Sequence, residues 1–392
     1  MRILSVVGAR PNFMKIAPLV SELRRVPAVE HCLVHTGQHY DQKLSGNFFQ
    51  ELGLPEPDIN LQIGSGSHTW QTAEVMKRLE PVLEKVRPDL VCVVGDVNST
   101  LAAALAAVKL GIRVAHIEAG LRSFDLSMPE EINRRVTDTV SDLLFVTEQS
   151  GVNNLQAEGV PHERIFLVGN VMIDTLLRHR AVAGRSTVLR ELQLTTGDSV
   201  APYALLTLHR PSNVDHPDVL EPILHAVSEI DQDLPVFFPI HPRTLARIQE
   251  MGCEHYFQNA SNGIARGIHR LEPLGYLDFL CLMDHSRLVL TDSGGIQEET
   301  TVLGVPCLTL RKNTERPVTV EQGTNQIVGT DGQRIVEASR SVLRQESRSS
   351  RCPPLWDGKA AERIIDIVLK RLGVTSENLE KGHTGREQLL PI

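Results

Sequence analysis

Short apolar runs rich in β-branched residues alternate along the chain with longer segments in which apolar residues recur at helical spacing. This alternation is typical of βαβ units, in which helices join the strands of a parallel sheet. In the first half, the predicted strands are residues 2–7, 30–36, 90–94, 112–117, 143–147 and 165–168. The helices predicted between them include residues 12–25, 71–86, 99–110 and 150–158.

A second series of the same kind begins near residue 203. Its predicted strands are residues 203–208, 235–240, 267–271, 287–291 and 305–310, and its predicted helices include 218–230 and 296–303. The pattern therefore predicts an α/β protein with two doubly wound halves, joined around residues 169–200.

The end of the chain has a different pattern. The polar, proline-containing stretch 345–358 predicts a loop. After it, residues 360–372 predict an amphipathic helix with Ile364, Ile365 and Val368 on one face. The residues that follow lack periodicity, and we expect them to form a flexible tail.

Composition narrows the class of protein. A chain of 392 residues is long enough for two domains, and a net charge of −8 makes a nucleic-acid-binding surface unexpected. The apolar run at the N-terminus is too short for a signal peptide or a membrane span. Six widely separated cysteines suit a reducing compartment. We therefore expect a cytoplasmic protein that binds neither nucleic acid nor membrane.

Acidic residues follow two successive buried strands. Asp96 comes two residues after the predicted strand 90–94, and Glu118 follows the next strand. The pair Glu130 and Glu131 comes soon after. Ligands of open parallel sheets bind at the carboxyl edge, where such acids gather. Neighbouring acids raise one another's pKa, which suits proton abstraction from a weakly acidic carbon. The alternative is that Asp96 caps the following helix.

Two glycine-containing turns are candidate anion sites. Gly8 follows the first strand, with Arg10 and Lys15 close behind it. Residues 290–299 lead an apolar strand into Ser293-Gly294-Gly295 and a helix, which is an arrangement that can cradle a diphosphate. Glu298 or Glu299 could accept hydrogen bonds from ribose hydroxyls. A plain strand-to-helix turn remains the alternative for both.

Two histidines end strands in the second half. His209 and His241 each follow an apolar run and precede a proline, which predicts that both stand at the ligand-facing edge of the sheet. The charged segment 311–317 follows another strand and either closes over a ligand or forms a solvated loop. His31 and His35 lie on a predicted strand, roughly 13 Å apart at the usual rise, and the chain has no H-E-x-x-H. We expect no catalytic metal.

Taken in order, these motifs form a recognisable set. They are G-A-R-P, G-D-V-N-S-T, H-I-E-A-G-L-R, P-E-E-x-N-R, T-x-H-R, I-H-P, D-S-G-G-I-Q-E-E and T-E-R-P. Over about residues 1–372 they resemble the non-hydrolysing UDP-N-acetylglucosamine 2-epimerase family.

The resemblance implies a GT-B-like fold of two Rossmann-like doubly wound domains with a ligand cleft between them. It predicts a first domain at 1–169, completed by a returning C-terminal helix at 359–373. The second, UDP-binding domain would be 170–358, with a tail at 374–392. Family members are typically homodimers.

The implied activity is reversible epimerisation at sugar C2 between UDP-GlcNAc and UDP-ManNAc, without a cofactor. It proceeds by elimination of UDP to a bound 2-acetamidoglucal, followed by re-addition. By motif, the acid/base residues would be Asp96, Glu118 and Glu130, with His209 near the diphosphate or assisting proton transfer. The predicted substrate-binding residues are Arg10, Lys15, Arg122, Arg134, His241, Ser293, Gly294, Gly295, Glu299 and Arg316.

Four alternatives stay open. A hydrolysing epimerase would release ManNAc and UDP, and a 2-epimerase of a related UDP-diacetamido sugar would keep the reaction and change the substrate. A glycosyltransferase would need an acceptor, and a nucleotide-sugar-binding regulator would turn nothing over. The run 37–41 keeps the Gln-His that holds a second UDP-GlcNAc in allosteric relatives, but 62–70 lacks the arginine expected beside it. We therefore do not expect activation by substrate.

Overall fold

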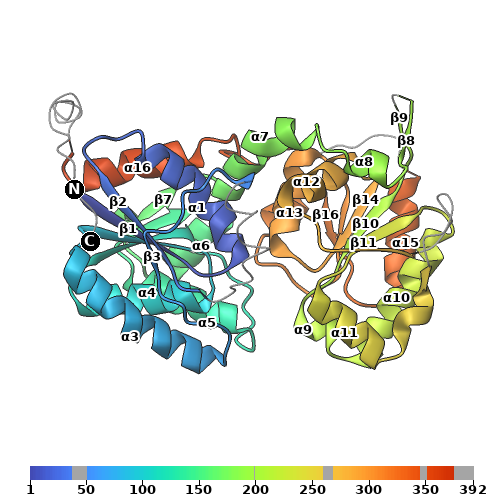
Figure 1. Ribbon diagram of the computed structural model, residues 1–392, viewed down its shortest axis with the longest axis horizontal. Helices are drawn as coiled ribbons and strands as arrows, with labels where there is room; N and C mark the ends of the chain where they lie inside the picture. The colour runs from blue at the N-terminus through green and yellow to red at the C-terminus, as the bar shows by residue number, and fades with distance from the viewer. Residues whose placement is uncertain (38–50, 198, 259–267, 345–350, 375–392) are drawn as a thin grey trace. The chain divides into compact units, whose positions relative to one another are not determined.

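The computed structural model describes residues 1–37, 51–197, 199–258, 268–344 and 351–374 (Figure 1). Contacts divide the chain into two compact units, which we call unit 1 (residues 1–175 and from 355 onward) and unit 2 (residues 176–354). The family resemblance places the domain boundaries at 169/170 and 358/359. The predicted tail lies outside the described residues except for Val374, and so does the run 37–41 except for Gly37.

Unit 1 is built on a sheet of parallel strands in the order β3-β2-β1-β4-β5-β6-β7. Its strands are β1 (Arg2–Val7), β2 (Glu30–His35), β3 (Ile59–Asn60), β4 (Leu90–Val94), β5 (Arg113–Ala119), β6 (Leu143–Val146) and β7 (Ile165–Leu167). The hydrophobic pattern finds six of them, whereas the two-residue β3 is too short to leave a periodic signal.

Helices cover both faces of this sheet (Figure 1). They are α1 (Arg10–Leu23), α3 (His68–Val86), α4 (Asn98–Lys109), α5 (Pro129–Val140), α6 (Gln149–Ala157), α7 (Val171–Ala183, which leads into unit 2) and α16 (Ala360–Arg371). Helix α4 buries a run of alanines, and these small side chains allow it to pack on α3, α5 and the sheet.

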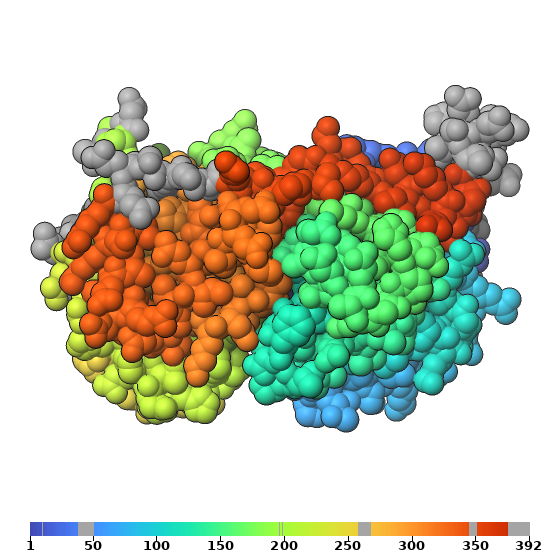
Figure 2. Space-filling model, turned by 180° about the vertical axis from the view of Figure 1, so that it is seen from behind, coloured from blue at the N-terminus to red at the C-terminus, as the bar shows by residue number. Residues whose placement is uncertain are grey.

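The C-terminal helix belongs to unit 1. It packs against α1 and buries Ile364 and Val368. Asp174 accepts hydrogen bonds from the first main-chain N–H groups of α16. Figure 2 shows this segment lying along the surface beside residues 163–168, where Arg363 and Arg371 donate to main-chain carbonyls.

Unit 2 has a second parallel sheet, in the order β12-β13-β11-β10-β14-β15-β16. Its strands are β10 (Ala204–Thr207), β11 (Val236–Pro239), β12 (Phe257–Gln258), β13 (Ile268–Leu271), β14 (Leu288–Thr291), β15 (Cys307–Thr309) and β16 (Asn325–Ile327), and a small hairpin pairs β8 (Thr195–Thr196) with β9 (Ser199–Val200). Its helices are α8 (Val188–Glu191), α9 (Pro211–Val214), α10 (Pro217–Asp231), α11 (Pro242–Glu250), α12 (Tyr276–His285), α13 (Gly294–Leu303), α14 (Val318–Glu321) and α15 (Gly332–Leu343).

Both sheets are doubly wound about their central strands. In unit 1, β1 pairs with β2 on one side and β4 on the other, and in unit 2, β10 pairs with β11 and β14. Successive connections leave the central strand in opposite directions, so a crevice opens at the carboxyl ends of β1/β4 and of β10/β14. Each unit is therefore a Rossmann-like domain, and the fold class predicted from the sequence is confirmed. No helix among the described residues is long and apolar enough to cross a bilayer.

Candidate active site

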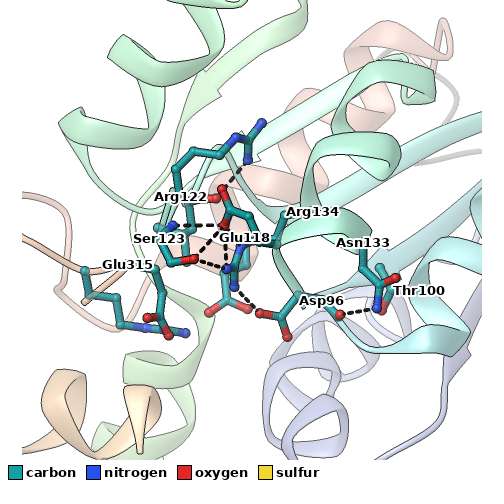
Figure 3. A network of polar contacts seen from close by, with 12 residues as sticks. Asp96, Thr100, Glu118, Arg122, Ser123, Asn133, Arg134 and Glu315 are labelled. Atoms are coloured by element: carbon teal, nitrogen blue, oxygen red, sulfur yellow. Dashed lines mark hydrogen bonds and ion pairs between the residues drawn. The ribbon is translucent and has the colours of Figure 1, made fainter. Parts of the chain in front are cut away.

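Asp96 lies at the carboxyl edge of the unit 1 sheet, just after β4. Its carboxylate accepts a hydrogen bond from Arg134 Nη1 at 2.6 Å (Figure 3). Arg134 comes from α5, and its other nitrogens bind the carboxylate of Glu131 at 2.7 and 3.1 Å. The predicted substrate-binding residue Arg134 is therefore held between two acids, while Asp96 keeps a quarter of its side chain exposed.

The two glutamates that begin α5 have different surroundings. Glu131 is fully buried and accepts from the main-chain N–H groups of Ser123 and Phe124, at 2.9 and 3.2 Å. Burial favours its neutral form, but the bonds from Ser123 and Arg134 outweigh burial and lower the pKa of Glu131. Glu130, the acid that the motif predicts to react, is only partly buried in the same turn. Glu131 thus anchors the loop that carries Ser123.

Glu118 stands at the carboxyl end of β5 in a strained backbone conformation. Its φ is +72°, which is uncommon for a residue other than glycine, and the pairing of β5 with β6 shifts register there. The side chain is buried and forms an ion pair with Lys15 of α1. The structure thus brings together two residues that the sequence places in separate motifs.

Gly95 lies close to this ion pair. A Cβ at Gly95 would be 2.9 Å from Lys15 Nζ and 3.2 Å from Glu118 Oε2, and its φ is +68°. Only glycine therefore suits this position on both conformational and steric grounds. The turn that precedes Asp96 and the carboxylate of Glu118 share one small volume.

A second ionic network supports these turns, with His116, Asp138 and Arg122 buried and Glu158 at the surface. His116 of β5 bonds Asp138 Oδ1 at 2.6 Å, and Asp138 Oδ2 pairs with Arg122 Nη1 at 2.7 Å. Arg122 also makes a double contact with Glu158, at 2.7 and 2.9 Å. Burial lowers the pKa of Arg122, but the hydrogen bonds and charges of Glu158 and Asp138 outweigh burial and raise it. Arg122, predicted to bind substrate, would have to exchange one of these partners to do so.

In unit 2, His209 follows β10 and pairs with an aspartate that follows β14. His209 Nδ1 lies 2.9 Å from Asp292 Oδ1, and Asp292 also accepts from the main-chain N–H groups of His209 and Arg210. Burial favours the neutral form of Asp292, but His209 and these N–H groups outweigh it and lower the pKa. The His209 side chain stays 53% exposed, so a fixed carboxylate orients a ring that solvent can reach.

The predicted diphosphate cradle is the start of α13. Ser293 is its N-cap without a side-chain cap, which leaves the first-turn N–H groups of Gly294 and Gly295 to other acceptors. A Cβ at Gly294 would lie 2.7 Å from Glu315 Oε1 and would overlap Arg316 Nη1. Gly294 therefore leaves room for the ends of Glu315 and Arg316 where the helix meets the segment 311–317.

Glu315 lies among three arginines. Its carboxylate is 2.5 Å from Arg316, 2.8 Å from Arg311 and 3.7 Å from Arg210. Burial raises its pKa, but these guanidinium groups outweigh burial and lower it, with Arg316 the strongest. Arg316 also contacts Glu298 at 2.7 Å. The predicted ligand-binding residue Arg316 thus belongs to a buried, mainly cationic cluster beside the start of α13.

The two remaining predicted residues of unit 2 have contrasting positions. Glu299 is buried and accepts a hydrogen bond from Tyr276 at 3.1 Å, and burial raises its pKa to about 8. His241 is exposed at the N-terminus of α11, where Nδ1 accepts from the N–H of Arg243 at 3.2 Å. Capping is the structural alternative to ligand binding for this histidine. The side chain of Arg10 lies outside the described residues.

Sequence reasoning misses Asp138, His116 and Asp292 as functional candidates. Asp292 had a detectable signal, because it precedes Ser293 at the same sheet edge as His209. Within the described part of the chain, no three His, Cys, Asp or Glu residues are arranged to hold a metal ion. The chemistry available at these edges is therefore proton transfer by carboxylates and histidine and anion binding by N–H groups and cations.

Known proteins share this sequence and fold. The sequence pattern of the family described as UDP-N-acetylglucosamine 2-epimerase matches residues 21–369. The UDP-N-acetylglucosamine 2-epimerase of Methanocaldococcus jannaschii is 42% identical over 94% of this chain and 99% of its own. The UDP-2,3-diacetamido-2,3-dideoxy-D-glucuronate 2-epimerase of Pseudomonas aeruginosa is 40% identical over 94% of this chain and 100% of its own.

Solved structures agree with the sequence relatives. The crystal structure of the Methanocaldococcus jannaschii UDP-GlcNAc 2-epimerase in complex with UDP-GlcNAc and UDP has a TM-score of 0.86 and 42% identity, covering 94% of this chain and all of that one. The Neisseria meningitidis UDP-GlcNAc 2-epimerase bound to UDP-GlcNAc has a TM-score of 0.84 and 31% identity, with coverage of 94% and 100%. The chain belongs to the UDP-N-acetylglucosamine 2-epimerase family, a family of isomerases with the GT-B-like pair of Rossmann-like domains.

Proposed function

We propose that this enzyme interconverts UDP-GlcNAc and UDP-ManNAc by inverting C2 of the sugar. The observation that carries the proposal is the buried Glu118, held in a strained conformation against Lys15 at the ligand-binding edge of unit 1. Strain of this kind persists where the surrounding structure enforces it, commonly at functional sites. Relatives that act on or bind UDP-GlcNAc support the choice of substrate.

The proposed reaction is an elimination followed by an addition. The C2–H bond is not next to a carbonyl, so its loss must be coupled to departure of UDP from C1. A carboxylate takes the C2 proton, the C–H electron pair forms the C1=C2 double bond, and the C1–O bond electrons leave with UDP. Re-addition of the UDP oxygen to C1, with protonation of C2 on the opposite face, gives the epimer. Asp96, Glu118 and Glu130 are the proposed acid/base groups.

Unit 2 would stabilise the leaving group. The N–H groups of the first turn of α13, which a helix does not itself pair, suit a diphosphate, and Arg10 and Lys15 would add positive charge. His209, oriented by Asp292, would donate a hydrogen bond or a proton to a phosphate oxygen as charge develops. Ser293, Gly294, Gly295, His241 and Glu299 would hold the nucleotide.

The three other predicted arginines would act mainly through the acids that they hold. Arg134 fixes Asp96, Arg316 fixes Glu315 beside Gly294, and Arg122 fixes Asp138. In this role each guanidinium sets the position and charge of a carboxylate instead of touching the sugar nucleotide. We also propose a homodimer, which light scattering of the purified protein tests.

One experiment tests the reaction directly. Purified protein is incubated with UDP-GlcNAc in D2O, and proton and phosphorus NMR follow sugar and phosphates together. We expect UDP-ManNAc with deuterium at C2 and no accumulation of free UDP. Stoichiometric free UDP and ManNAc would indicate the hydrolysing reaction instead, and an unchanged spectrum would refute the proposal.

A second substrate is favoured by one observation. The Pseudomonas aeruginosa relative named for UDP-2,3-diacetamido-2,3-dideoxy-D-glucuronate matches this chain nearly as well as the Methanocaldococcus jannaschii enzyme does. The same acids and the same leaving group would serve that sugar. Comparing kcat/KM for both nucleotide sugars decides between them, and a large preference for the diacetamido sugar would reassign the substrate but not the reaction.

A further inference from the structure

His116 faces hydrogen-bond acceptors at both ring nitrogens. Nδ1 lies 2.6 Å from a carboxylate oxygen of Asp138, and Nε2 lies 2.8 Å from the main-chain oxygen of Gly95. A neutral imidazole has a single N–H and could satisfy only one of them. The ring is fully buried, so water cannot supply the missing donor. The doubly protonated imidazolium is the form that fits both contacts.

The charges around His116 point the same way. Asp138 is almost completely buried, and its carboxylate lies 2.6 Å from His116 Nδ1 and 2.7 Å from Arg122 Nη1. Glu158, the other partner of Arg122, is exposed and also lies 3.9 Å from Arg135, so it does not add to the charge inside the protein. Although burial favours the neutral form of Asp138, His116 and Arg122 outweigh burial and lower its pKa.

The main-chain oxygen that His116 binds belongs to the turn that carries Asp96. Gly95 also donates its own N–H to the carbonyl of Ile117 at 3.0 Å, so residues of β5 bind both the N–H and the carbonyl of Gly95. A Cβ added at Gly95 would meet the Lys15–Glu118 ion pair. Asp138 fixes the chain just after Glu118, because its carboxylate accepts a hydrogen bond from the N–H of Gly120 at 3.1 Å.

We propose that His116 is a doubly protonated positioning residue that fixes the Gly95–Asp96 turn and, through Asp138, the chain after Glu118. It does not reach the reacting atoms itself. This inference rests on the proposed epimerisation, in which Asp96 and Glu118 move protons at C2. Loosening the turn should slow proton transfer more than it weakens nucleotide binding, because the diphosphate contacts proposed for unit 2 do not involve it.

Two substitutions separate the contacts of the ring. In His116→Asn the side-chain amide reaches only as far as ring Nδ1, so it keeps a donor for Asp138 and loses the bond to Gly95. In His116→Gln the amide nitrogen reaches the position of Nε2 and keeps the bond to Gly95. We expect His116→Asn to lower kcat at least about tenfold, with KM and the Kd of UDP within about twofold of wild type. His116→Gln should retain most of kcat.

A kinetic isotope effect shows whether proton transfer is what slows. With substrate deuterated at C2, the effect on kcat should be larger in His116→Asn than in wild type. Wild-type kcat in His116→Asn, equal losses in both variants, or an unchanged isotope effect would each overturn the positioning role.

The charge state has its own test, which needs no turnover. Wild-type protein labelled with 15N-histidine should give a buried histidine signal with both ring nitrogens protonated at neutral pH, and this signal should be absent from the spectrum of either substitution. A neutral tautomer at His116 would overturn the inference even if neither variant folds. If wild-type protein fails to epimerise UDP-GlcNAc, the proposed function fails in the first assay while this spectrum still decides the charge state.

Discussion

Each of the two units holds a histidine against a buried aspartate at the carboxyl edge of its sheet, but the two pairs differ in exposure. His116 is fully buried, and both ring nitrogens have partners within unit 1. The His209 side chain is 53% exposed, and its aspartate contacts Nδ1. The same two residue types thus make a buried pair with every ring nitrogen in contact with the protein in unit 1, and a pair that solvent can reach in unit 2.

The surroundings of the two pairs differ in the same sense. In unit 1 the edge carries carboxylates, and Lys15 and Arg134 hold two of them in place. In unit 2 the edge carries the N-terminus of α13, and three arginines beside it surround Glu315. This difference agrees with the proposal that unit 1 takes protons from carbon and that unit 2 holds the anionic leaving group. Breaking each arrangement should produce a different defect.

The largest effect is expected from the acid of unit 1 that lies against Lys15. Glu118→Gln keeps the shape of the side chain but removes its capacity to accept a proton. We expect turnover to fall at least about a hundredfold, a usual scale for the loss of an acid/base group, while the affinity for UDP stays near wild type. Steady-state kinetics and calorimetric titration with UDP measure the two quantities.

A matched substitution controls for the loss of a buried acid. Asp174→Asn also turns a buried carboxylate of unit 1 into an amide, but Asp174 caps α16 far from these motifs in sequence. It should change melting temperature more than turnover. Wild-type turnover in Glu118→Gln would remove Glu118 from the mechanism.

The next largest effect is expected from Asp292, which pairs with the exposed His209 of unit 2. In Asp292→Asn a neutral amide replaces the carboxylate, so a His209 ring protonated at both nitrogens, the form that can give a proton to the leaving group, loses its counter-charge. We expect kcat to fall at least about tenfold, with the loss concentrated in UDP departure. Asp231→Asn is the control, since Asp231 is a buried acid of unit 2 that accepts from the N–H of Val236. Equal kinetics in the two variants would contradict an orienting role for Asp292.

The strands and the acids at their ends are predictable from sequence because they depend on local patterns. The apolar run 90–94 specifies a buried strand, and Gly95-Asp96 directly after it specifies a turn, without any tertiary information. The Ser293-Gly294-Gly295 turn is equally local, and the structure places it at the start of α13 as expected.

The partners of these residues are not predictable in the same way. Asp138 meets His116 only because α5 packs beside β5 with a particular rotation, and Asp292 meets His209 only because β14 pairs with β10 in a particular register. The sequence of motifs marks Arg122 and Arg134 as binding residues, but it does not reveal that each is held by acids of unit 1. Side-chain pairing depends on register and helix rotation, which hydrophobic periodicity does not specify.

A smaller effect is expected at the turn that His116 holds. Gly95→Ala places a Cβ against Lys15 and Glu118 and strains a left-handed residue. Gly111→Ala is the matched control, because Gly111 has φ of +72° with nothing within 4 Å of its Cβ. Both should lose roughly 1 kcal/mol of unfolding free energy, while only Gly95→Ala should also lose turnover. Denaturant unfolding and kinetics on the same preparations measure the difference, and equal turnover would show that the close approach is unimportant.

The smallest effect concerns stability and depends on pH. Burial raises the pKa of Glu299 in unit 2 to about 8, above its ordinary value of 4.5. Between these values the folded state holds a proton that the unfolded state has released, so stability falls as pH rises through this window. Glu299→Gln removes this dependence while it keeps a hydrogen-bond acceptor for Tyr276. The melting temperature of wild type relative to Glu299→Gln should therefore decline from pH about 5 to about 9, measured by calorimetry. A constant difference would mean that Glu299 is ionised throughout, which would make unit 2 less cationic beside α13 than its arginines indicate.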